Sequence, residues 1–418
     1  MSWQIGNFDL VSARTSRTSC ASDTKIGPRL ADRKRQLRVA VYSPDQHLAY
    51  DVRTLDRIGV GGGVTSRIRM AHALAARGHK VTAYVNCPGE ADLDGVSYRH
   101  FSRANSLQAD VLIATTSGGA FDLRPLQEVS TNGALRIMMA HGVRPPRGFQ
   151  PESFDYIYAP SNFIRDTLVS AWGVSATDTL VCWRGVRDSY YAPHRGKAPD
   201  RDPYAIAYAA HPSKGLEAAR AVLRKLREHD LRFTLHVFGG PSLWGDPDET
   251  TASQPGLVFH GLLGQRRLAR ELMACGFSLN LQTRREPFGM VIPEAMRAGC
   301  IVLASPVGAY PEIIQHGRNG FLITGDPLQP RTHQTAADLM IELVGSPTKL
   351  AALRRRARAT PLDWAVVAGA WEGHWEWVRR GSAPTTGVCD QCGGERISLS
   401  DGPHCTVCGR YQRPISES

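Results

Sequence analysis

Short apolar runs alternate with amphipathic segments along most of the chain between residues 37 and 345. The first unit shows the pattern clearly. The run 37–42 (LRVAVY) is followed by a glycine-rich loop and then by 64–79, where Ile68, Ala71, Leu74 and Ala75 recur at the spacing of one helical face. A glycine at position 78 is placed to end this helix. Strands that alternate with helices in this way predict a parallel sheet.

The alternation continues in two series separated by the polar, proline-bearing stretch 191–203. We therefore predict an α/β fold of two Rossmann-like, doubly wound domains that face each other across a cleft, with residues 37–195 in the first and 196–362 in the second. The predicted strands lie at 37–42, 81–85, 110–116, 135–140, 156–160 and 179–183 in the first series, and at 204–210, 232–239, 257–261, 277–282 and 300–305 in the second.

A tryptophan-rich segment, 363–380, follows the second series and ends a group of three helical stretches. Its tryptophans at 364, 371, 375 and 377 have helical spacing, which favours packing over base stacking. We expect this helix to pack back on the first domain. Residues 381–388 have the composition of a flexible linker.

Four of the nine cysteines lie close together at the C-terminal end of the chain and form the pattern C-x2-C-x12-C-x2-C. Each pair is followed by a glycine, and two thiolate pairs on such turns can surround zinc tetrahedrally. The sequence therefore predicts a structural zinc ion in a small zinc ribbon, residues 389–411, in which the metal supplies folding energy. The ribbon lacks an interleaved basic and aromatic face, which favours a structural or protein-docking role over nucleic-acid binding. The predicted ligands are Cys389, Cys392, Cys405 and Cys408.

Composition narrows the class of protein. With 42% apolar and 21% charged residues, the chain is globular, which excludes a disordered, collagenous or coiled-coil chain. The net charge of +11 implies an anionic partner. Charge alone does not distinguish nucleic acid, an acidic membrane surface and a phosphorylated ligand. Residues 1–36 have no signal-peptide core and are interpreted as a flexible tail. We expect a cytoplasmic protein, with peripheral membrane contact through the basic stretch 349–358 as an alternative to a solvated helix face.

The stretch 285–314 carries the most informative chemistry. A tight loop, E-P-F-G, leaves a predicted strand and leads into a helix whose first turn suits Pro293. Glu286 lies in the loop and Glu294 in that first turn, so both carboxylates can face a ligand whose phosphate rests on the helix N-terminus. An ionised carboxylate accepts hydrogen bonds from paired sugar hydroxyls.

This arrangement, continued by A-G-C, a strand, G-A-Y-P-E-I-I and G-R-N-G-F-L, resembles the donor site of glycosyltransferase family 4. Enzymes of this family have the GT-B fold and transfer sugar from an activated donor with retention at the anomeric carbon. The resemblance covers residues 37–380. It implies that Glu286 orients the sugar, that Glu294 holds the ribose, and that Phe288, Gly289 and Met290 belong to the donor-binding loop.

Other positions match the same family. Lys214, after the first strand of the second domain, fits the cation placed against the donor phosphates. The family usually has an arginine a few residues earlier; His211 stands near that position and is the donor-binding candidate that would share the neutralisation of the phosphates. Gly62 and Gly63 match the first-domain loop that faces the donor, and His141 matches a residue that contacts the donor sugar. Arg184 departs from the pattern, because asparagine is usual there.

The resemblance implies a retaining transfer from a nucleotide-diphosphate sugar to an acceptor hydroxyl, with Glu286, Lys214 and His141 as the catalytic set. The pairs Asp92/Asp94 and Asp246/Asp248 are interpreted as polar loops, so no catalytic metal is expected. Two alternatives stay open: a nucleotide-sugar epimerase of the same fold, and a zinc-ribbon protein that binds nucleic acid or another protein. The donor sugar and the acceptor are not specified by the sequence.

Overall fold

The computed structural model describes residues 35–117, 119–193, 197, 199–240, 254–380 and 385–411. Most of the predicted tail and the Asp246/Asp248 pair lie outside the described residues, as do the first four residues of the predicted linker 381–388. None of the helices within the described ranges is long and apolar enough to cross a membrane.

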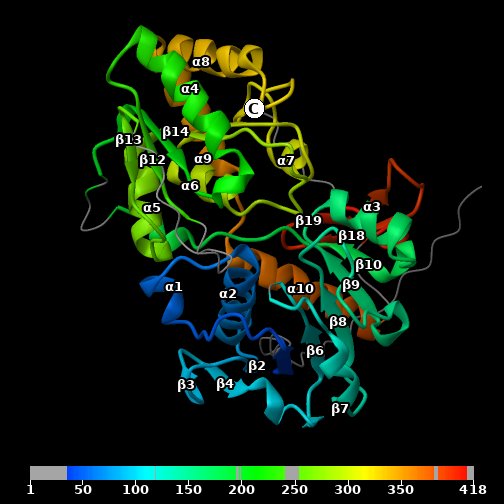
Figure 1. Ribbon diagram of the computed structural model, residues 1–418. Helices are drawn as coiled ribbons and strands as arrows, with labels where there is room; N and C mark the ends of the chain where they lie inside the picture. The colour runs from blue at the N-terminus through cyan, green and yellow to red at the C-terminus, as the bar shows by residue number, and fades with distance from the viewer. Residues whose placement is uncertain are drawn as a thin grey trace, which may run out of the picture. The chain divides into compact units, whose positions relative to one another are not determined.

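The first half of the chain forms an eight-stranded sheet with the order β10-β9-β8-β6-β1-β2-β4-β3 (Figure 1). Neighbouring strands are parallel except β3, which pairs with β4 in the antiparallel sense. The strands are β1 (Arg38–Tyr42), β2 (Lys80–Val85), β3 (Ala91–Leu93), β4 (Val96–His100), β6 (Val111–Ala114), β8 (Leu135–Met139), β9 (Tyr156–Ala159) and β10 (Thr179–Val181).

The second half forms a six-stranded sheet with the order β13-β12-β11-β14-β15-β16, and all its neighbours are parallel. In both sheets the chain starts in the middle and reverses direction there, between β1 and β6 and between β11 and β14. Such a reversal opens a crevice at the carboxyl ends of the strands, where ligands bind. The strands are β11 (Asp202–Tyr208), β12 (Thr234–Val237), β13 (Leu257–Phe259), β14 (Cys275–Asn280), β15 (Ile301–Ala304) and β16 (Phe321–Leu322).

Helices connect these strands and bury their apolar faces against the sheets. In α2, Ile68, Ala71 and Leu74 are buried as the sequence predicts, whereas Ala75 of the same predicted face is half-buried. Gly78, with φ at 97°, follows the helix. The helices are α1 (Thr54–Arg57), α2 (Gly62–Ala76), α3 (Asn162–Ala171), α4 (Leu216–His229), α5 (Gln265–Ala274), α6 (Val291–Ala298), α7 (Tyr310–Ile313), α8 (Pro330–Val344), α9 (Pro347–Ala359) and α10 (Trp364–Arg380).

Short 3-10 turns and one small sheet complete the connections. The two-stranded parallel sheet joins β5 (Ser106–Leu107) and β7 (Ser130–Thr131). The turns are η1 (Phe101–Arg103), η2 (Arg124–Glu128), η3 (Pro151–Ser153), η4 (Ala176–Asp178), η5 (Asp188–Tyr190) and η6 (Pro212–Lys214).

The tryptophan helix α10 belongs to the core of the first half. It contacts α2, and Trp364, Trp371 and Trp375 are buried in a cluster that also contains residues of β1, β2 and β6. The predicted packing of these tryptophans against the first half is therefore observed. The same cluster includes Ile397 and Leu399, so the apolar side of the cysteine-bearing segment shares this core.

The cysteine-bearing segment is a three-stranded antiparallel sheet of β17 (Thr385–Val388), β18 (Glu395–Leu399) and β19 (Gly402–Cys405). The sheet begins four residues before the first cysteine, within the stretch that composition alone marks as linker. Asp92 and Asp94 also have more structure than a loop, because they lie in and after β3. Asp94, with φ at 46°, makes the turn into β4.

Candidate functional site

The site lies where the six-stranded sheet reverses direction, and its central contact is an ion pair between two predicted residues. Lys214 follows β11 and Glu286 follows β14, and these two strands are neighbours. The Nζ atom of Lys214 lies 2.6 Å from Oε1 of Glu286, whose side chain is 8% exposed. Because the strands are parallel and adjacent, residues far apart in sequence meet at their carboxyl ends.

The turn that carries Lys214 is fixed by its neighbours. His211 caps η6: its Nδ1 atom lies 2.9 Å from the hydroxyl of Ser213, and its carbonyl oxygen accepts from the Tyr208 hydroxyl at 2.7 Å. Gly215 follows with φ at 106°, and a Cβ there would lie 1.9 Å from the carbonyl oxygen of Leu281. Only glycine fits this close approach, which holds the lysine turn against the end of β14.

A second constrained glycine shapes the loop after Glu286. Gly289 has φ at 77°, and a Cβ there would lie 2.4 Å from the ring of Tyr310. The Tyr310 hydroxyl accepts a hydrogen bond from the side-chain amide of Gln282 at 2.7 Å, and burial raises the pKa of this tyrosine well above its usual range. The loop is thus in close contact with a buried, neutral tyrosine.

Phe288, predicted to bind the donor, is turned into the core. Its side chain is 4% exposed, and its ring lies 6.1 Å from that of Trp183 in an edge-on contact. The side chain therefore anchors the loop, while the backbone of Gly289 and Met290 leads into α6. Met290 is the N-cap residue of that helix.

The two glycines of the first half connect this loop to His141. A Cβ on Gly62 would lie 2.9 Å from Cγ of Met290. A Cβ on Gly63 would lie 2.2 Å from the side chain of Ser117 and 3.6 Å from Nδ1 of His141. The predicted residues Gly62, Gly63, His141 and Met290 are therefore brought together, and α2 begins at Gly62 rather than after the loop.

His141 is held in the neutral form. Burial lowers the pKa of its imidazole well below the usual range, and the positive charges of Arg184 and Arg67 lower it further. Its Nε2 atom is buried and has no hydrogen-bond partner in the described parts of the chain. Arg184 is buried as well and donates from Nη2 to the carbonyl oxygen of Ala140 at 2.8 Å, and burial lowers the pKa of its guanidinium to about 10.

Glu294 lies in a different environment from Lys214 and Glu286. It lines a small cavity whose described lining residues include Arg69 and Gln265 but neither Lys214 nor Glu286. Burial raises the pKa of Glu294 to about 7, although the charge of Arg69 opposes this shift. Arg69 itself bonds the side-chain oxygen of Gln265 at 2.7 Å and the Tyr190 hydroxyl at 2.9 Å.

Sequence reasoning missed a buried ion pair at the reversal point of the first sheet. The Nη1 atom of Arg67 lies 2.9 Å from Oδ2 of Asp45, and both side chains are almost fully buried. The pair is extended by hydrogen bonds to the hydroxyls of Ser43, Thr116 and Ser117. The signal in the sequence is weak, because Asp45 lies in a loop and Arg67 in a helix, and only the sheet order brings them together.

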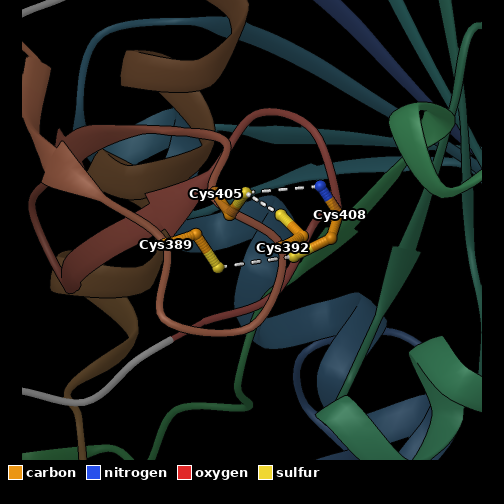
Figure 2. A group of neighbouring side chains, drawn as sticks. All are labelled: Cys389, Cys392, Cys405 and Cys408. Carbon is orange, nitrogen blue, oxygen red and sulfur yellow. Dashed lines mark hydrogen bonds between the residues drawn. The ribbon is translucent and has the colours of Figure 1, made fainter.

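The four cysteines predicted to bind zinc converge at one end of the three-stranded sheet (Figure 2). Their sulfur atoms all lie within 4.8 Å of one another, with 3.7 Å between Cys389 and Cys408 and 3.5 Å between Cys392 and Cys405. Sulfurs bound tetrahedrally to zinc at about 2.3 Å would be about 3.8 Å apart, whereas disulfide sulfurs are bonded at about 2.05 Å. The donor set and its spacing therefore fit zinc.

Solved structures share the two-domain fold of this chain. Anabaena HepE, crystallised with UDP and glucose, aligns with 82% of this chain over its whole length at a TM-score of 0.56 and 16% identity. A glycosyltransferase from Rickettsia africae aligns with 83% of this chain, again over its whole length, at a TM-score of 0.61 and 14% identity. These likenesses show the fold alone, and it is the two-domain GT-B fold that the sequence predicts.

The family match lies in the second half of the chain. Residues 204–358 match the family described as "Glycosyl transferases group 1". A segment of 121 residues is 36% identical to the D-inositol 3-phosphate glycosyltransferase of Streptomyces scabiei. That segment is 27% of this chain and 27% of the relative, so the match spans about a quarter of the relative's length.

Proposed function

We propose that this protein is a glycosyltransferase that moves a sugar from a nucleotide-diphosphate donor to an acceptor hydroxyl, with retention at the anomeric carbon. The observation that carries the proposal is the Lys214–Glu286 pair, 2.6 Å between charged atoms at the reversal point of a sheet, within the segment that matches a glycosyltransferase family. The GT-B fold and the residues of the Gly62–Met290 contact agree with it. The comparisons favour neither the epimerase nor the nucleic-acid-binding alternative.

In this proposal the second half supplies most of the groups that bind the donor, and the first half supplies His141. Lys214 and the backbone amides at Gly289 and Met290 would stabilise the negative charge that develops on the departing diphosphate. Glu286 would orient the sugar through its hydroxyls. His141, neutral because of burial and two nearby arginines, would exchange hydrogen bonds with the sugar without repelling the developing positive charge. Glu294 has no role in donor binding in this proposal, because its side chain lines the cavity beside Arg69 and not the site of the Lys214–Glu286 pair.

The reaction breaks one bond and forms another at the same carbon. The bond between the anomeric carbon and the diphosphate oxygen breaks, and the oxygen leaves with the electron pair. The acceptor hydroxyl oxygen then bonds to that carbon from the same face, and its proton passes to the departing diphosphate. The positions of both reactants in one closed site supply the proximity that such a transfer needs.

Zinc at the cysteine cluster would be structural. Cys389, Cys392, Cys405 and Cys408 would hold the ion, and its chemistry there would be to cross-link the two turns that carry the cysteine pairs. Both turns are built alike, since the amides of Gly393 and Gly409 each donate to the carbonyl oxygen of the first cysteine of their pair, at 2.9 and 3.0 Å.

The proposal is tested by titrating UDP, ADP and GDP into the full chain by calorimetry and by analysing products from several nucleotide sugars by mass spectrometry. We expect Lys214→Ala to weaken nucleoside-diphosphate binding by about tenfold or more, since a charge-assisted hydrogen bond contributes about 1.5–3 kcal/mol. Lys225→Ala is the matched control, because that lysine lies on the exposed side of α4 and bonds Gln334.

Glu286→Gln keeps the shape of the side chain and removes its charge. We expect its turnover to fall about 100-fold while its nucleoside-diphosphate affinity stays within about threefold of wild type. Failure of every nucleoside diphosphate to bind the wild-type chain, or equal affinity and turnover in Lys214→Ala and wild type, would contradict the proposed function.

A further inference from the structure

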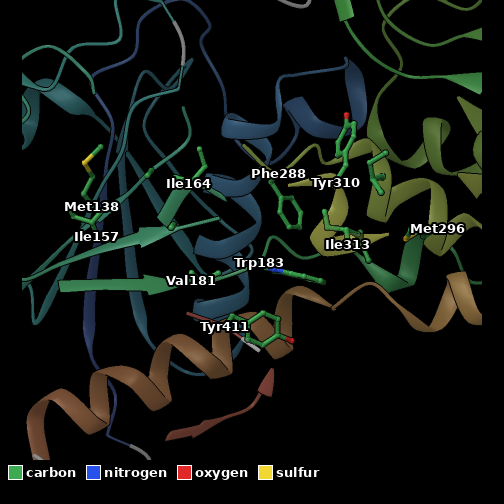
Figure 3. Packing of buried hydrophobic residues seen from close by; sticks show 14 of the residues in the cluster. Met138, Ile157, Ile164, Val181, Trp183, Phe288, Met296, Tyr310, Ile313 and Tyr411 are labelled. Carbon is green, nitrogen blue, oxygen red and sulfur yellow. The ribbon is translucent and has the colours of Figure 1, made fainter. Parts of the chain in front are cut away.

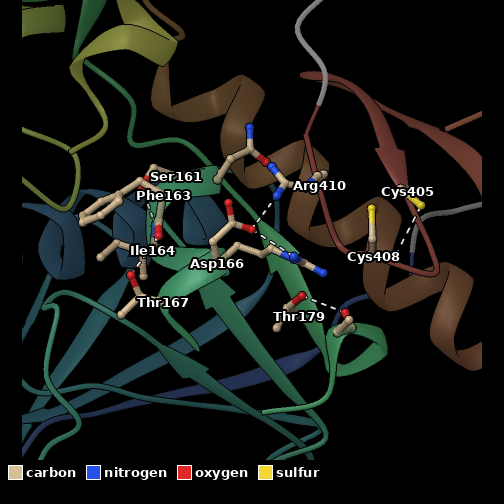
Figure 4. Close-up of polar contacts among 12 residues, drawn as sticks. Ser161, Phe163, Ile164, Asp166, Thr167, Thr179, Cys405, Cys408 and Arg410 are labelled. Carbon is tan, nitrogen blue, oxygen red and sulfur yellow. Dashed lines mark hydrogen bonds and ion pairs between the residues drawn. The ribbon is translucent and has the colours of Figure 1, made fainter. Parts of the chain in front are cut away.

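The backbone that follows the last cysteine pair lies against the first half of the chain. The amide of Val181, in the edge strand β10, donates to the carbonyl oxygen of Gly409 at 2.9 Å. A Cβ on Gly409 would lie 2.3 Å from the carbonyl oxygen of Thr179, so the two backbones are in close contact. Arg410 adds an ion pair with Asp166 of α3 at 2.6 Å (Figure 4). A backbone hydrogen bond and an ion pair therefore hold the ribbon against the first half of the chain.

The next residue, Tyr411, continues into the core next to the candidate site. Its ring is 4% exposed and lies 5.3 Å from the ring of Trp183, edge-on. Trp183 in turn contacts Phe288 at 6.1 Å, and Phe288 is the buried anchor of the loop between Glu286 and Gly289. Figure 3 shows the three rings in sequence, Tyr411, Trp183 and Phe288. Aromatic packing thus connects the ribbon to the loop.

A second connection runs through the start of α3. The side-chain amide of Asn162 donates to the carbonyl oxygen of Tyr411 at 3.1 Å. The Ser161 hydroxyl donates to the carbonyl oxygen of Pro287, in the loop itself, at 2.6 Å. The amides of Asn162 and Phe163 donate to the Glu312 carboxylate at 2.8 and 2.7 Å, which ties α3 to α7. Both connections start at the same residue of the ribbon and end at the same loop.

The cysteine turn determines where Tyr411 lies. The Cys405 amide donates to the carbonyl oxygen of Arg410 at 3.0 Å, and the Cys408 amide donates to the sulfur of Cys405 at 3.3 Å. A metal that holds both sulfurs would fix this turn, and with it the residues that follow. Without the metal, a turn closed by a few backbone bonds would open more readily.

We infer that the cysteine ribbon is a positioning device for the candidate donor loop, and that Tyr411 is its positioning residue, acting through Trp183 and Phe288. The inference goes beyond the proposed function, since it states what the ribbon does, and it rests on that function only for the name of the loop. It predicts that zinc at the cysteines and order in residues 284–290 are coupled.

The test is hydrogen exchange on the zinc-loaded full chain, with no nucleotide present, so that the outcome is independent of the proposed activity. In Tyr411→Ala we expect amides of residues 284–290 to exchange about tenfold faster, while β1 and β2 exchange as in wild type and zinc content stays the same. Tyr411→Phe, which keeps the ring, restores wild-type exchange. Val388→Ser is the ribbon control, because that side chain is 63% exposed.

Two further arms make the result decisive. Removing zinc with a chelator should increase exchange at 284–290 in wild type but add little in Tyr411→Ala, because the connection is already broken. If Tyr411→Ala does not fold, Tyr411→Leu is measured in its place, because leucine fills more of the buried space while still removing the aromatic ring. Wild-type exchange at 284–290 in a folded Tyr411→Ala or Tyr411→Leu chain, or after zinc removal, would overturn the inference. Faster exchange without any nucleoside-diphosphate binding would support it and contradict only the proposed function.

Discussion

The Glu294 side chain should make the stability of the folded protein depend on pH. Its carboxyl has a pKa of about 7 in the folded protein, raised by burial beside Arg69 from an unfolded value of 4.5. The folded state therefore binds a proton that the unfolded state releases between these values. The stability associated with this group is fully present below about pH 4.5 and is lost as pH rises through about 7.

We expect Glu294→Gln to remove this dependence. Relative to the variant, the wild-type free energy of unfolding should fall by about 2–3 kcal/mol between pH 5 and pH 8. Urea unfolding at the two pH values measures it, with Glu342→Gln as the exposed control. Parallel pH profiles for Glu294→Gln and wild type would show that the carboxyl is ionised in the folded protein at pH 5.

At the level of elements, the position of the loop between β14 and α6 depends on Gly289, which has a left-handed backbone and lies close to the Tyr310 ring. Gly289 and Gly317 have similar φ values, 77° and 74°, but a Cβ at Gly289 would meet Tyr310 whereas at Gly317 nothing lies within 4 Å. Gly317→Ala therefore isolates the cost of the left-handed backbone, which is about 1 kcal/mol.

Gly289→Ala should combine this cost with displacement of the loop. We expect a loss of stability greater than in Gly317→Ala by about 1 kcal/mol or more, and nucleoside-diphosphate affinity lowered by about tenfold, while Gly317→Ala binds as wild type. Denaturant unfolding and calorimetry measure the two effects. Equal stability and affinity in both variants would mean that the loop moves away from Tyr310 without cost.

Much at this scale could be predicted from the sequence, and the predicted fold is confirmed. The sequence predicts the central strands because apolar runs such as those of β11 and β15 are buried on both faces of the sheet. The β3–β4 hairpin was missed because Asp92 and Asp94 make its first strand short and polar. The contact of Glu294 with the Arg69 cavity could not be predicted either, because it depends on how α2, α5 and α6 pack, and local pattern does not determine that.

At the scale of the whole molecule, the ribbon and the tryptophan helix share one core. Ile397 and Leu399 of β18 pack with Trp371 and Trp375 of α10, so the ribbon should not unfold alone. We expect zinc removal to lower the single thermal transition of the full chain rather than to create a second one. Differential scanning calorimetry with and without chelator measures this.

Cys392→Ser is the matched variant for that measurement, because Cys392 is the exposed member of the four cysteines and its substitution disturbs packing least. It should unfold at the temperature of the chelated wild type and respond no further to chelator. A separate low-temperature transition, with the main one unchanged, would show that the ribbon is an independent unit.

The contact between Gly409 and β10 also has a consequence for solubility. β10 is the last strand of the eight-stranded sheet, and an uncovered border strand offers its amides and carbonyls to any passing chain. Because the C-terminal segment bonds to part of β10, it covers a sheet edge that could otherwise pair with strands of other copies of the chain. We therefore expect a shortened protein that stops after α10 to aggregate through β10, even where its second half folds well.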